Sequence, residues 1–205
     1  MDILQPVYTE TAECQDCYKC LRECAVKAIC IQDGHARVIP EACLQCGHCV
    51  TICPVKAKKV RGDLERVRLL LKLRKQTYIS LAPSYVAEFP EYSSQQIIAG
   101  LKALGFAGVS LTALGAQEVS ATAAELLRTR PGLYISSACP VITDLVHKYY
   151  PEFSENVTAV YSPMLAHSKM LREEYGADIG VVFIGPCVAK KDESDRHKDM
   201  LEVAL

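Results

Sequence analysis

The spacing of apolar residues changes near residue 62, beyond which helical and extended patterns alternate along the chain. In the connecting segment 61–76, apolar residues recur three or four positions apart, at Leu64, Val67, Leu70 and Leu71. This period predicts an amphipathic helix. Short apolar runs bounded by turn residues predict strands at 78–82, 107–112, 133–136 and 179–184. The last run is unbroken, which is typical of a strand covered on both faces.

Capping residues mark the helices between these runs. Ser93 or Ser94 begins a predicted helix that ends before Gly105. Further helices are predicted at 113–128, 140–149 and 163–176, the last two with proline at the start. Strands that alternate with helices in this way predict an α/β domain with a mainly parallel sheet. The sequence has no glycine-rich phosphate loop, which argues against a nucleotide site.

The cysteines before residue 54 form two copies of one spacing. The run C-x-x-C-x-x-C-x-x-x-C occupies residues 14–24 and recurs at 43–53, so each cysteine has a counterpart 29 residues later. The flanks repeat as well, because Cys24-Ala25-Val26-Lys27-Ala28 is echoed by Cys53-Pro54-Val55-Lys56-Ala57. We interpret this segment as an internal duplication.

Each copy has the spacing of an iron–sulfur ligand set. Three closely spaced thiolates can bind three corners of a cube, while a fourth cysteine beyond a turn is directed to the neighbouring cube. The sequence therefore predicts two 4Fe-4S clusters with crossed ligation. The first would be bound by Cys14, Cys17, Cys20 and Cys53. The second would be bound by Cys43, Cys46, Cys49 and Cys24.

Zinc and disulfides are the alternatives for these cysteines. A structural zinc site needs only four ligands, usually as two C-x-x-C pairs with a longer spacer, whereas eight cysteines in two runs suit two cubes. Disulfides need an oxidising compartment, and residues 1–6 have neither the basic nor the apolar region of a secretory signal. Both alternatives are disfavoured.

The cysteine-rich stretch resembles bacterial two-cluster ferredoxins over about the first 60 residues. The resemblance implies an α+β ferredoxin-like N-terminal domain. The sequence departs from that family at Ala25, where a second proline is common.

Composition divides the chain at the same place. At 205 residues, half of them hydrophobic, the chain can bury a substantial core. Nine of the 11 cysteines precede residue 54. We therefore predict a cluster-binding domain at 1–60, a connector helix at 61–76 and the α/β domain at 77–205.

The charge distribution excludes some classes of partner. The formal net charge is −1 with both signs interspersed, so there is no electrostatic footprint for nucleic acid. No apolar run approaches the roughly 18 residues needed to span a bilayer. We expect a soluble, cytoplasmic protein.

Four basic residues follow the second cysteine run, at Lys56, Lys58, Lys59 and Arg61. Their charges would raise the cluster potential or dock an acidic electron donor, or they form an ordinary solvated face. His48 lies between two ligands and is expected at the surface, with a hydrogen bond to cluster sulfur as the alternative. Cys30 fits no ligand position and is expected to be a small buried side chain.

The two remaining cysteines, Cys139 and Cys187, each follow a predicted strand. The carboxyl ends of parallel strands meet at one edge of a sheet, where open α/β folds bind ligands. Both thiols are therefore expected at that edge, close enough to share a metal. On spacing alone, two packing residues are an equal alternative, because free cysteine is among the most buried residue types.

Three motifs give this second pair a specific resemblance. They are Ser136-Ser137-Ala138-Cys139-Pro140, Tyr161-Ser162-Pro163-Met164 and Gly185-Pro186-Cys187-Val188-Ala189-Lys190-Lys191-Asp192-Glu193. In this order, after a two-cluster ferredoxin module, they resemble the iron-only (FeFe) hydrogenase family. The resemblance implies that Cys139 and Cys187 bind the 4Fe-4S part of the hydrogen-activating H-cluster. It also implies that Lys190 contacts a cyanide ligand of the two-iron subsite and that Glu193 lies near the proton route.

The departures from that family point to its sensory branch. Hydrogen-evolving members carry two adjacent cysteines in the first motif, the earlier one relaying protons, and this chain has Ala138 there. Gly185 stands where methionine commonly precedes the second motif's proline, and the family's paired glutamates are missing at Thr122 and Ala123. These changes resemble members whose slow turnover reports hydrogen.

The family's third motif supplies two more cysteines, and the sequence ends at Leu205 before it. We therefore expect a partial hydrogenase domain, an H-cluster only in a full-length protein, and no hydrogenase activity from the 205-residue chain alone.

These features predict an iron–sulfur electron-transfer protein, a hydrogen sensor or slow hydrogenase when full length. Electrons would pass through the two clusters to the H-cluster site. The alternative is a non-enzymatic ferredoxin-type redox or regulatory protein with a degenerate hydrogenase domain. Both need a redox partner, such as a ferredoxin-like donor or acceptor, and the sensory interpretation implies a downstream signalling domain.

Overall fold

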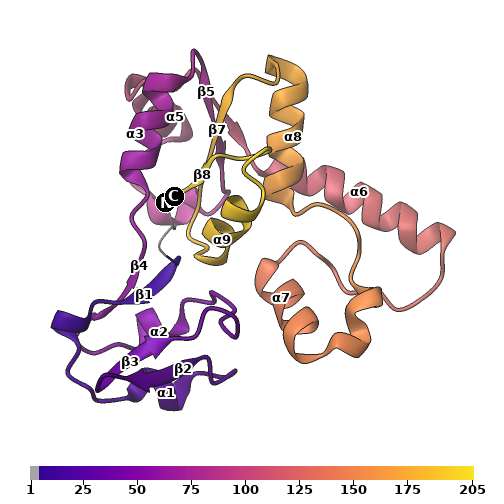
Figure 1. Ribbon diagram of the computed structural model, residues 1–205. Helices are drawn as coiled ribbons and strands as arrows, with labels where there is room; N and C mark the ends of the chain where they lie inside the picture. Colours follow the sequence, from indigo (N-terminus) through magenta and orange to yellow (C-terminus); the bar gives the residue numbers. More distant parts are fainter. Residues whose placement is uncertain (1–4) are drawn as a thin grey trace.

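A four-stranded parallel sheet forms the centre of the larger part of the computed structural model, which describes residues 5–205 (Figure 1). Its strands lie in the order β6-β5-β7-β8. They are β5 (Thr77–Leu81), β6 (Gly108–Leu111), β7 (Gly180–Ile184) and β8 (Val203–Ala204). Because all three strand pairs are parallel, the predicted mainly parallel sheet is confirmed.

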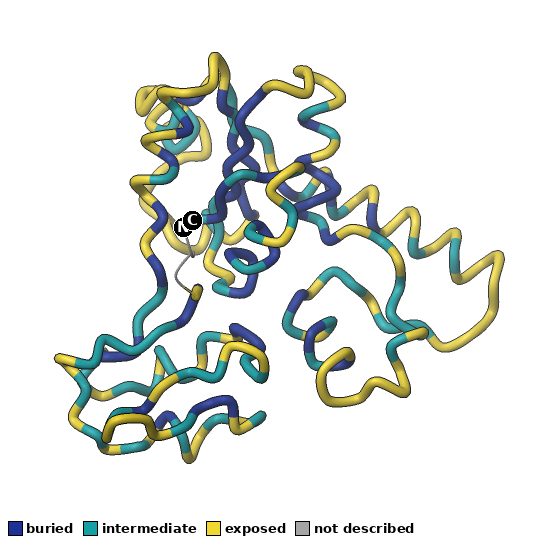
Figure 2. The backbone as a smooth tube through the Cα atoms, in the orientation of Figure 1, coloured by how far each residue is buried: buried dark blue, intermediate teal, exposed yellow. Residues whose placement is uncertain are grey.

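Helices cover both faces of this sheet. On one face, α3 (Leu64–Leu73) and α5 (Ser94–Ala103) pack over Val182 of β7. On the other face, α8 (Pro163–Tyr175) packs over Val181 and Phe183. Successive residues of β7 thus point into two different cores, and Figure 2 shows the buried backbone concentrated in these strands. This arrangement explains the unbroken apolar run in the sequence.

The sequence signals for helix ends are confirmed. The amide of Gln96 donates to Ser93 Oγ at 3.3 Å, and the amide of Ser93 donates to Gln96 Oε1 at 2.9 Å, which together form the capping box of α5. Proline opens α7 (Pro140–Tyr149) and α8. Among residues 5–205, no helix combines the length and the apolar character that crossing a membrane requires.

The other helices of this part are α4 (Tyr85–Glu88), α6 (Ala113–Thr129), η2 (Pro151–Asn156) and α9 (Ala189–Arg196). α6 crosses α8 so closely that a Cβ atom at Gly115 would lie 2.2 Å from the carbonyl oxygen of Pro163. Glycine is therefore required at this crossing. The far end of α6 extends away from the sheet and is exposed (Figures 1 and 2).

The predicted strand at 133–136 is wrong. Only Ile135 makes a β-bridge there, to Val157. Its amide donates to Asn156 O at 2.8 Å and its carbonyl accepts from Thr158 at 2.9 Å. Leu133 is 62% exposed, so the short apolar run is not covered as a strand of the sheet would be. The segment belongs to an excursion between α6 and α8 that carries α7, which packs against α9 and not against the strands of the sheet (Figure 1).

The cysteine-rich part contains two small antiparallel sheets. β1 (Val7–Thr9) pairs with β4 (Lys58–Val60), and β2 (Ile29–Gln32) pairs with β3 (His35–Val38). The short helices are η1 (Thr11–Glu13), α1 (Lys19–Glu23) and α2 (His48–Thr51). α1 and α2 carry the third cysteine of each run, so the two runs have the same local structure.

The 29-residue repeat extends to the backbone dihedrals. Residues with positive φ in the first copy recur 29 positions later in the second, as Asp16 and Gln45, Tyr18 and Gly47, Lys27 and Lys56. Non-glycine residues seldom adopt this conformation. Three matched pairs therefore support the internal duplication that the cysteine spacing indicates.

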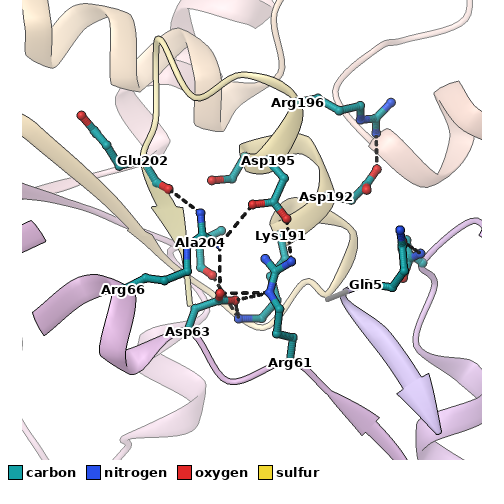
Figure 3. Close-up of polar contacts among 12 residues, drawn as sticks. Gln5, Arg61, Asp63, Arg66, Lys191, Asp192, Asp195, Arg196, Glu202 and Ala204 are labelled. Carbon is teal, nitrogen blue, oxygen red and sulfur yellow. Dashed lines mark hydrogen bonds and ion pairs between the residues drawn. The ribbon is translucent and has the colours of Figure 1, made fainter. Parts of the chain in front are cut away.

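A buried carboxylate joins the cysteine-rich part to the sheet (Figure 3). The Asp63 side chain is fully buried and accepts hydrogen bonds from Arg61 Nε at 2.9 Å, Arg66 Nη1 at 2.9 Å and Lys191 Nζ at 3.0 Å. Both arginines also contact the carboxylate of Asp195, at 2.7 Å from Arg61 and 3.1 Å from Arg66. The segment that leaves β4 is thereby attached to α9.

The same network reaches the edge of the sheet. Lys191 Nζ donates to the carbonyl oxygen of Ala204 in β8 at 3.0 Å. Burial alone would raise the pKa of Asp63, but hydrogen bonds from Lys191 and Arg66 and the charge of Arg61 outweigh it and hold the pKa below its usual value. Asp63 is therefore an anion at neutral pH, matched by buried cations.

Removing this anion should destabilise the protein strongly. Asp63→Ala leaves buried cations without their partner, which we expect to cost about 3–5 kcal/mol of unfolding free energy. The matched control is Glu65→Ala, which removes an exposed carboxylate paired with Arg68 and should cost less than about 1 kcal/mol. Anaerobic urea unfolding of the cluster-loaded protein measures both values. Equal midpoints for the two variants would contradict the role of Asp63.

A buried histidine connects α8 to two strands. His167 is 1% exposed, and its Nδ1 and Nε2 atoms lie 2.8 Å from Ser80 Oγ and 2.9 Å from Ser110 Oγ. Ser80 Oγ also lies 2.8 Å from Thr112 Oγ1. Burial lowers the pKa of His167 to about 4, and Glu174 offsets this only in part. The ring is neutral at pH 7, and its hydrogen bonds hold β5, β6 and α8 together.

The lowered pKa predicts a loss of stability in weak acid. Between pH 6.5 and 4 the unfolded chain protonates this histidine while the folded chain does not, so the stabilisation is complete above about pH 6.5 and decreases as the pH falls. One pKa unit corresponds to about 1.4 kcal/mol. Between pH 7 and pH 5 we therefore expect the free energy of unfolding of wild type to fall by about 2 kcal/mol more than that of His167→Gln. Urea midpoints at both pH values give this double difference. Parallel pH profiles would contradict it.

Candidate metal centres

Two cavities in the cysteine-rich part are each lined by four cysteines. One is lined by Cys14, Cys17, Cys20 and Cys53. The other, of about 110 Å³, is lined by Cys24, Cys43, Cys46 and Cys49. Each cavity takes three cysteines from one run and the fourth from the other run. This is the grouping that the sequence predicts for crossed ligation, and we call these the first and the second cysteine cavity.

The chemistry of these cavities suits a metal cluster. Within residues 5–205 all 11 cysteines are free thiols. Burial raises the pKa of Cys49 to about 11, and it also raises the pKa of Cys20 and of Cys43. Neighbouring thiolates of the same cavity add to these rises. Thiols with raised pKa values stay protonated at neutral pH unless a cationic centre stabilises the thiolate form. A bound metal cluster supplies such a centre, because cysteine binds metals as the thiolate anion.

Backbone amides favour the anionic form of the fourth cysteine. Burial alone would raise the pKa of Cys53, but the amides of residues 55–58 donate to its sulfur and lower the pKa below the usual value. In the other copy, the amide of Ala28 donates to Cys24 Sγ at 3.3 Å. In each copy, therefore, the loop after the fourth cysteine donates at least one backbone N–H to its sulfur.

A smaller ligand group overlaps the first cysteine cavity. Ligand atoms of Cys14, Asp16 and His35 lie within 4.8 Å of one another, and His35 Nδ1 is 3.0 Å from Asp16 Oδ1. Cys14 belongs to both groups, so its thiolate can serve only one of them. Four thiolates favour iron–sulfur chemistry, and Asp16 and His35 then lie beside the cavity as hydrogen-bonding neighbours.

The second pair of cysteines lies where two helices begin. Cys139 is the N-cap of α7, while Cys187 follows β7 and precedes α9. The expectation that both follow strands is therefore wrong for Cys139, because no strand forms at 133–136. Both side chains are exposed.

Polar contacts nevertheless bring the two cysteine motifs together. Lys190 Nζ donates to the carbonyl oxygen of Ala138 at 3.3 Å and to Glu193 Oε2 at 2.7 Å. Ser162, from the middle motif, donates to the same carboxylate oxygen at 3.0 Å. Lys190 and Glu193 are both buried. All three motifs that carry the resemblance thus meet around this Lys190–Glu193 pair.

A cavity of about 260 Å³ adjoins this pair between α7, α8 and α9. Its polar lining includes Ser137, Thr143, Ser162, Glu193 and Arg196. Arg196 is paired with Asp144 of α7 at 3.0 Å and with Asp192 at 3.0 Å. Cys139 and Cys187 do not line this cavity.

The second cysteine cavity lies next to the second motif. A Cβ atom at Gly47, between two cysteines of that cavity, would lie 3.4 Å from Val188 Cγ2. Gly47 has a φ of 78°, a conformation that favours glycine. Because Val188 directly follows Cys187, the loop around this cavity packs against a side chain of the second motif.

The end of α7 donates hydrogen bonds to the backbone around the same cavity. Lys148 Nζ donates to Cys43 O at 2.8 Å, and Tyr149 OH donates to Ala42 O at 2.8 Å and Val26 O at 3.3 Å. The sequence analysis did not single out Lys148 or Tyr149. Their only signal was their place in the last turn of a helix that begins at Cys139.

The basic residues after the second run divide into two groups. Lys58 and Arg61 are buried, so an ordinary solvated face is wrong for these two. Lys59 is part-exposed and pairs with Glu13 at 2.6 Å. His48 is exposed, as expected. The burial of Lys58 could have been found from the 29-residue repeat, because its counterpart is the apolar Ile29.

Two protein families match the chain. The family described as "Iron only hydrogenase large subunit, C-terminal domain" matches residues 75–203, and "4Fe-4S binding domain" matches residues 36–59. The second match contains the whole second cysteine run. Iron–sulfur binding and a relationship to FeFe hydrogenases are thereby established for the chain.

Individual relatives agree with both matches. Iron hydrogenase 1 of Clostridium pasteurianum is 27% identical over 164 residues, which is 70% of this chain and 29% of that protein. A component of the ion-translocating oxidoreductase complex of Methanosarcina acetivorans is 44% identical over 48 residues, or 23% of this chain and 18% of that protein. The indolepyruvate oxidoreductase protein IorA of Methanothermobacter marburgensis is 38% identical over 58 residues, or 28% of this chain and 9% of that protein.

The chain thus spans less than a third of the length of each of these relatives. The hydrogenase match nevertheless covers more than half of the chain and contains Cys139, Cys187, Lys190 and Glu193. The chain therefore belongs to the iron-only hydrogenase large-subunit family through its C-terminal domain.

Proposed function

We propose that this chain is an iron–sulfur electron-transfer protein of the sensory type. Residues 1–60 bind two 4Fe-4S clusters, residues 61–76 connect them to the sheet, and residues 77–205 hold part of an H-cluster site. The first cluster is bound by Cys14, Cys17, Cys20 and Cys53. The second is bound by Cys43, Cys46, Cys49 and Cys24. When bound, such clusters take up and release single electrons.

One contact carries this proposal. Gly47, in the loop of the second cysteine cavity, lies against Val188, which adjoins Cys187. The second cavity is therefore the one next to the second motif, and Cys49 of that cavity packs against the buried cluster that contains Cys20 of the first cavity. This order supports an electron route that enters near the first cavity and leaves the second cavity toward Cys187.

The chain's own residues orient the H-cluster site. Glu193 and the carbonyl oxygen of Ala138 fix the Lys190 ammonium group, and Ser162 fixes Glu193 in turn. The ammonium group is thus held between the Cys139 and Cys187 motifs, where it can interact with an anionic ligand. Glu193 also lines the 260 Å³ cavity and can exchange a proton with a group bound there.

The role of the protein depends on what receives the electrons. We infer a redox partner, a ferredoxin-like donor or acceptor, and, for a sensory role, a downstream signalling domain. Ala138 supports sensing over rapid hydrogen turnover, because a methyl group cannot relay a proton. The same residue is compatible with a non-enzymatic redox protein. Infrared spectra of protein that also supplies the third cysteine motif would separate the hydrogen sensor from the non-enzymatic redox protein. Bands of carbon monoxide and cyanide ligands are expected only for the sensor, because only the sensor needs the two-iron subsite.

Iron analysis and EPR test the crossed ligation. After anaerobic reconstitution we expect about eight irons per chain. Cys24→Ser should change the EPR spectrum of the reduced protein in the same way as Cys46→Ser, because both thiolates bind the second cluster. It should differ from Cys17→Ser. Cys30→Ser is the matched control and should leave both signals unchanged.

Other results would contradict the assignment. A Cys24→Ser spectrum that matches Cys17→Ser would rule out the crossing. Binding of about four irons, or of stoichiometric zinc, would rule out two cubes.

Ala138 makes a separate prediction about turnover. In protein that also supplies the third motif and the two-iron cofactor, Ala138→Cys should raise hydrogen production, since a positioned acid or base is typically worth about 10²–10⁴-fold. Ala138→Ser, similar in size but a poor proton donor, is the control. Equal rates for all three proteins would show that proton delivery at this position is not limiting.

A further inference from the structure

A buried lysine lies in the cysteine-rich part beside the proposed clusters. Lys58, in β4, is only 3% exposed and lines the first cysteine cavity. Its Nζ atom donates to the carbonyl oxygen of Ala36 at 2.9 Å and to Thr9 Oγ1. Two neutral oxygens therefore hold the ammonium group at a fixed place.

This cation has no carboxylate partner among residues 5–205, where no ion pair involves it. The other two buried lysines of these residues each have a carboxylate partner, Lys190 with Glu193 at 2.7 Å and Lys191 with Asp63 at 3.0 Å. Burying an ammonium group without an anion is costly. Some other negative charge must therefore compensate Lys58 in the loaded protein.

The thiolates of both cysteine cavities lie within its field. Ala36, whose carbonyl oxygen accepts the hydrogen bond from Lys58, lies in one buried cluster with Cys20, and Cys49 packs against that cluster. Cys20 lines the first cavity and Cys49 the second. One ammonium group thus acts on a ligand of each proposed cluster.

The repeat shows that the fold does not require a lysine here. Ile29 occupies the equivalent position in the first copy, 29 residues earlier, and is 7% exposed. Ile29 and Lys58 both stand in β-strands, the one in β2 and the other in β4. An apolar side chain therefore fits this place in the copy that has no buried charge.

Resting on the proposed two-cluster function, we propose that Lys58 is a shared counter-ion of both clusters and raises the midpoint potential of each. Each reduction adds one electron to a centre that its thiolates already make anionic, and a fixed cation nearby favours the reduced form. At an effective dielectric constant of about 20, one buried charge changes the reduced-to-oxidised ratio by roughly tenfold. For a one-electron couple this ratio corresponds to about 59 mV.

The test is an anaerobic, EPR-monitored redox titration with dithionite. Lys58→Ile introduces the residue that the first repeat has at this position. It should lower both midpoint potentials by the amount that corresponds to a roughly tenfold fall in the reduced-to-oxidised ratio. Lys59→Ile is the matched control, because it removes the same charge from the same strand at a part-exposed position paired with Glu13. It should leave both potentials nearly unchanged.

The outcomes separate this inference from the proposed function. Unchanged potentials in a Lys58→Ile protein that holds both clusters would overturn the counter-ion role, as would equal shifts in the two variants. Fewer than two clusters in wild type would instead overturn the proposed function. If Lys58→Ile does not bind the clusters, Lys58→Arg and Lys58→Gln are compared in its place. Cluster binding that arginine restores and glutamine does not supports the counter-ion role. Equal cluster binding and equal midpoint potentials in these two variants contradict it.

Discussion

The arrangement of this molecule depends on one buried carboxylate. Asp63 stands between the last strand of the cysteine-rich part and the first helix of the larger part, and it binds cations from α3 and α9 at once. A flexible joint at this point would leave the cysteine cavities free to move relative to the sheet. Asp63 instead fixes the start of α3, and contacts of Gly47 with Val188 and of Tyr149 with Ala42 attach the second cysteine cavity to the larger part as well.

Buried charge serves different ends in the two parts. Around Asp63 the carboxylate oxygens lie within 3.0 Å of three cationic groups, so each of these cations has an anion in direct contact and the role of the group is structural. Around Lys58 the direct partners are neutral oxygens. A lone buried cation creates a field that extends beyond its contacts. Residues in one short stretch, 58–63, therefore supply both the rigid joint and the electrostatic influence on the cavities.

The sequence predicted what depends on local pattern. The apolar run at 179–184 predicted β7 of the sheet. Ser93 and Pro140 predicted the starts of α5 and α7, because the hydrogen bonds and dihedral angles at a helix start are set by neighbours in sequence. The strand at 133–136 failed because a four-residue run needs a partner strand, and its one rung to Val157 comes from a segment the pattern does not reveal. The contacts of Lys58 with Thr9 and Ala36 also come from residues that are remote in sequence, so its burial is indicated only by the comparison with Ile29 in the other copy of the repeat.

The sequence motifs that meet around Lys190 and Glu193 could be picked out in advance, but the elements that bring them together could not. The motif order indicated that Cys139 and Cys187 belong together, yet α7, rather than a strand, brings Cys139 into place. A helix of 10 residues is about 15 Å long and rigid. Its first residue adjoins Cys139, while Lys148 and Tyr149 near its end bind the loop around Cys43. α7 is therefore a spacer that sets how far Cys139 lies from the second cysteine cavity. The rate of electron transfer depends steeply on distance. In the proposed electron route, the rigid helix α7 therefore fixes the distance between the second cysteine cavity and Cys139.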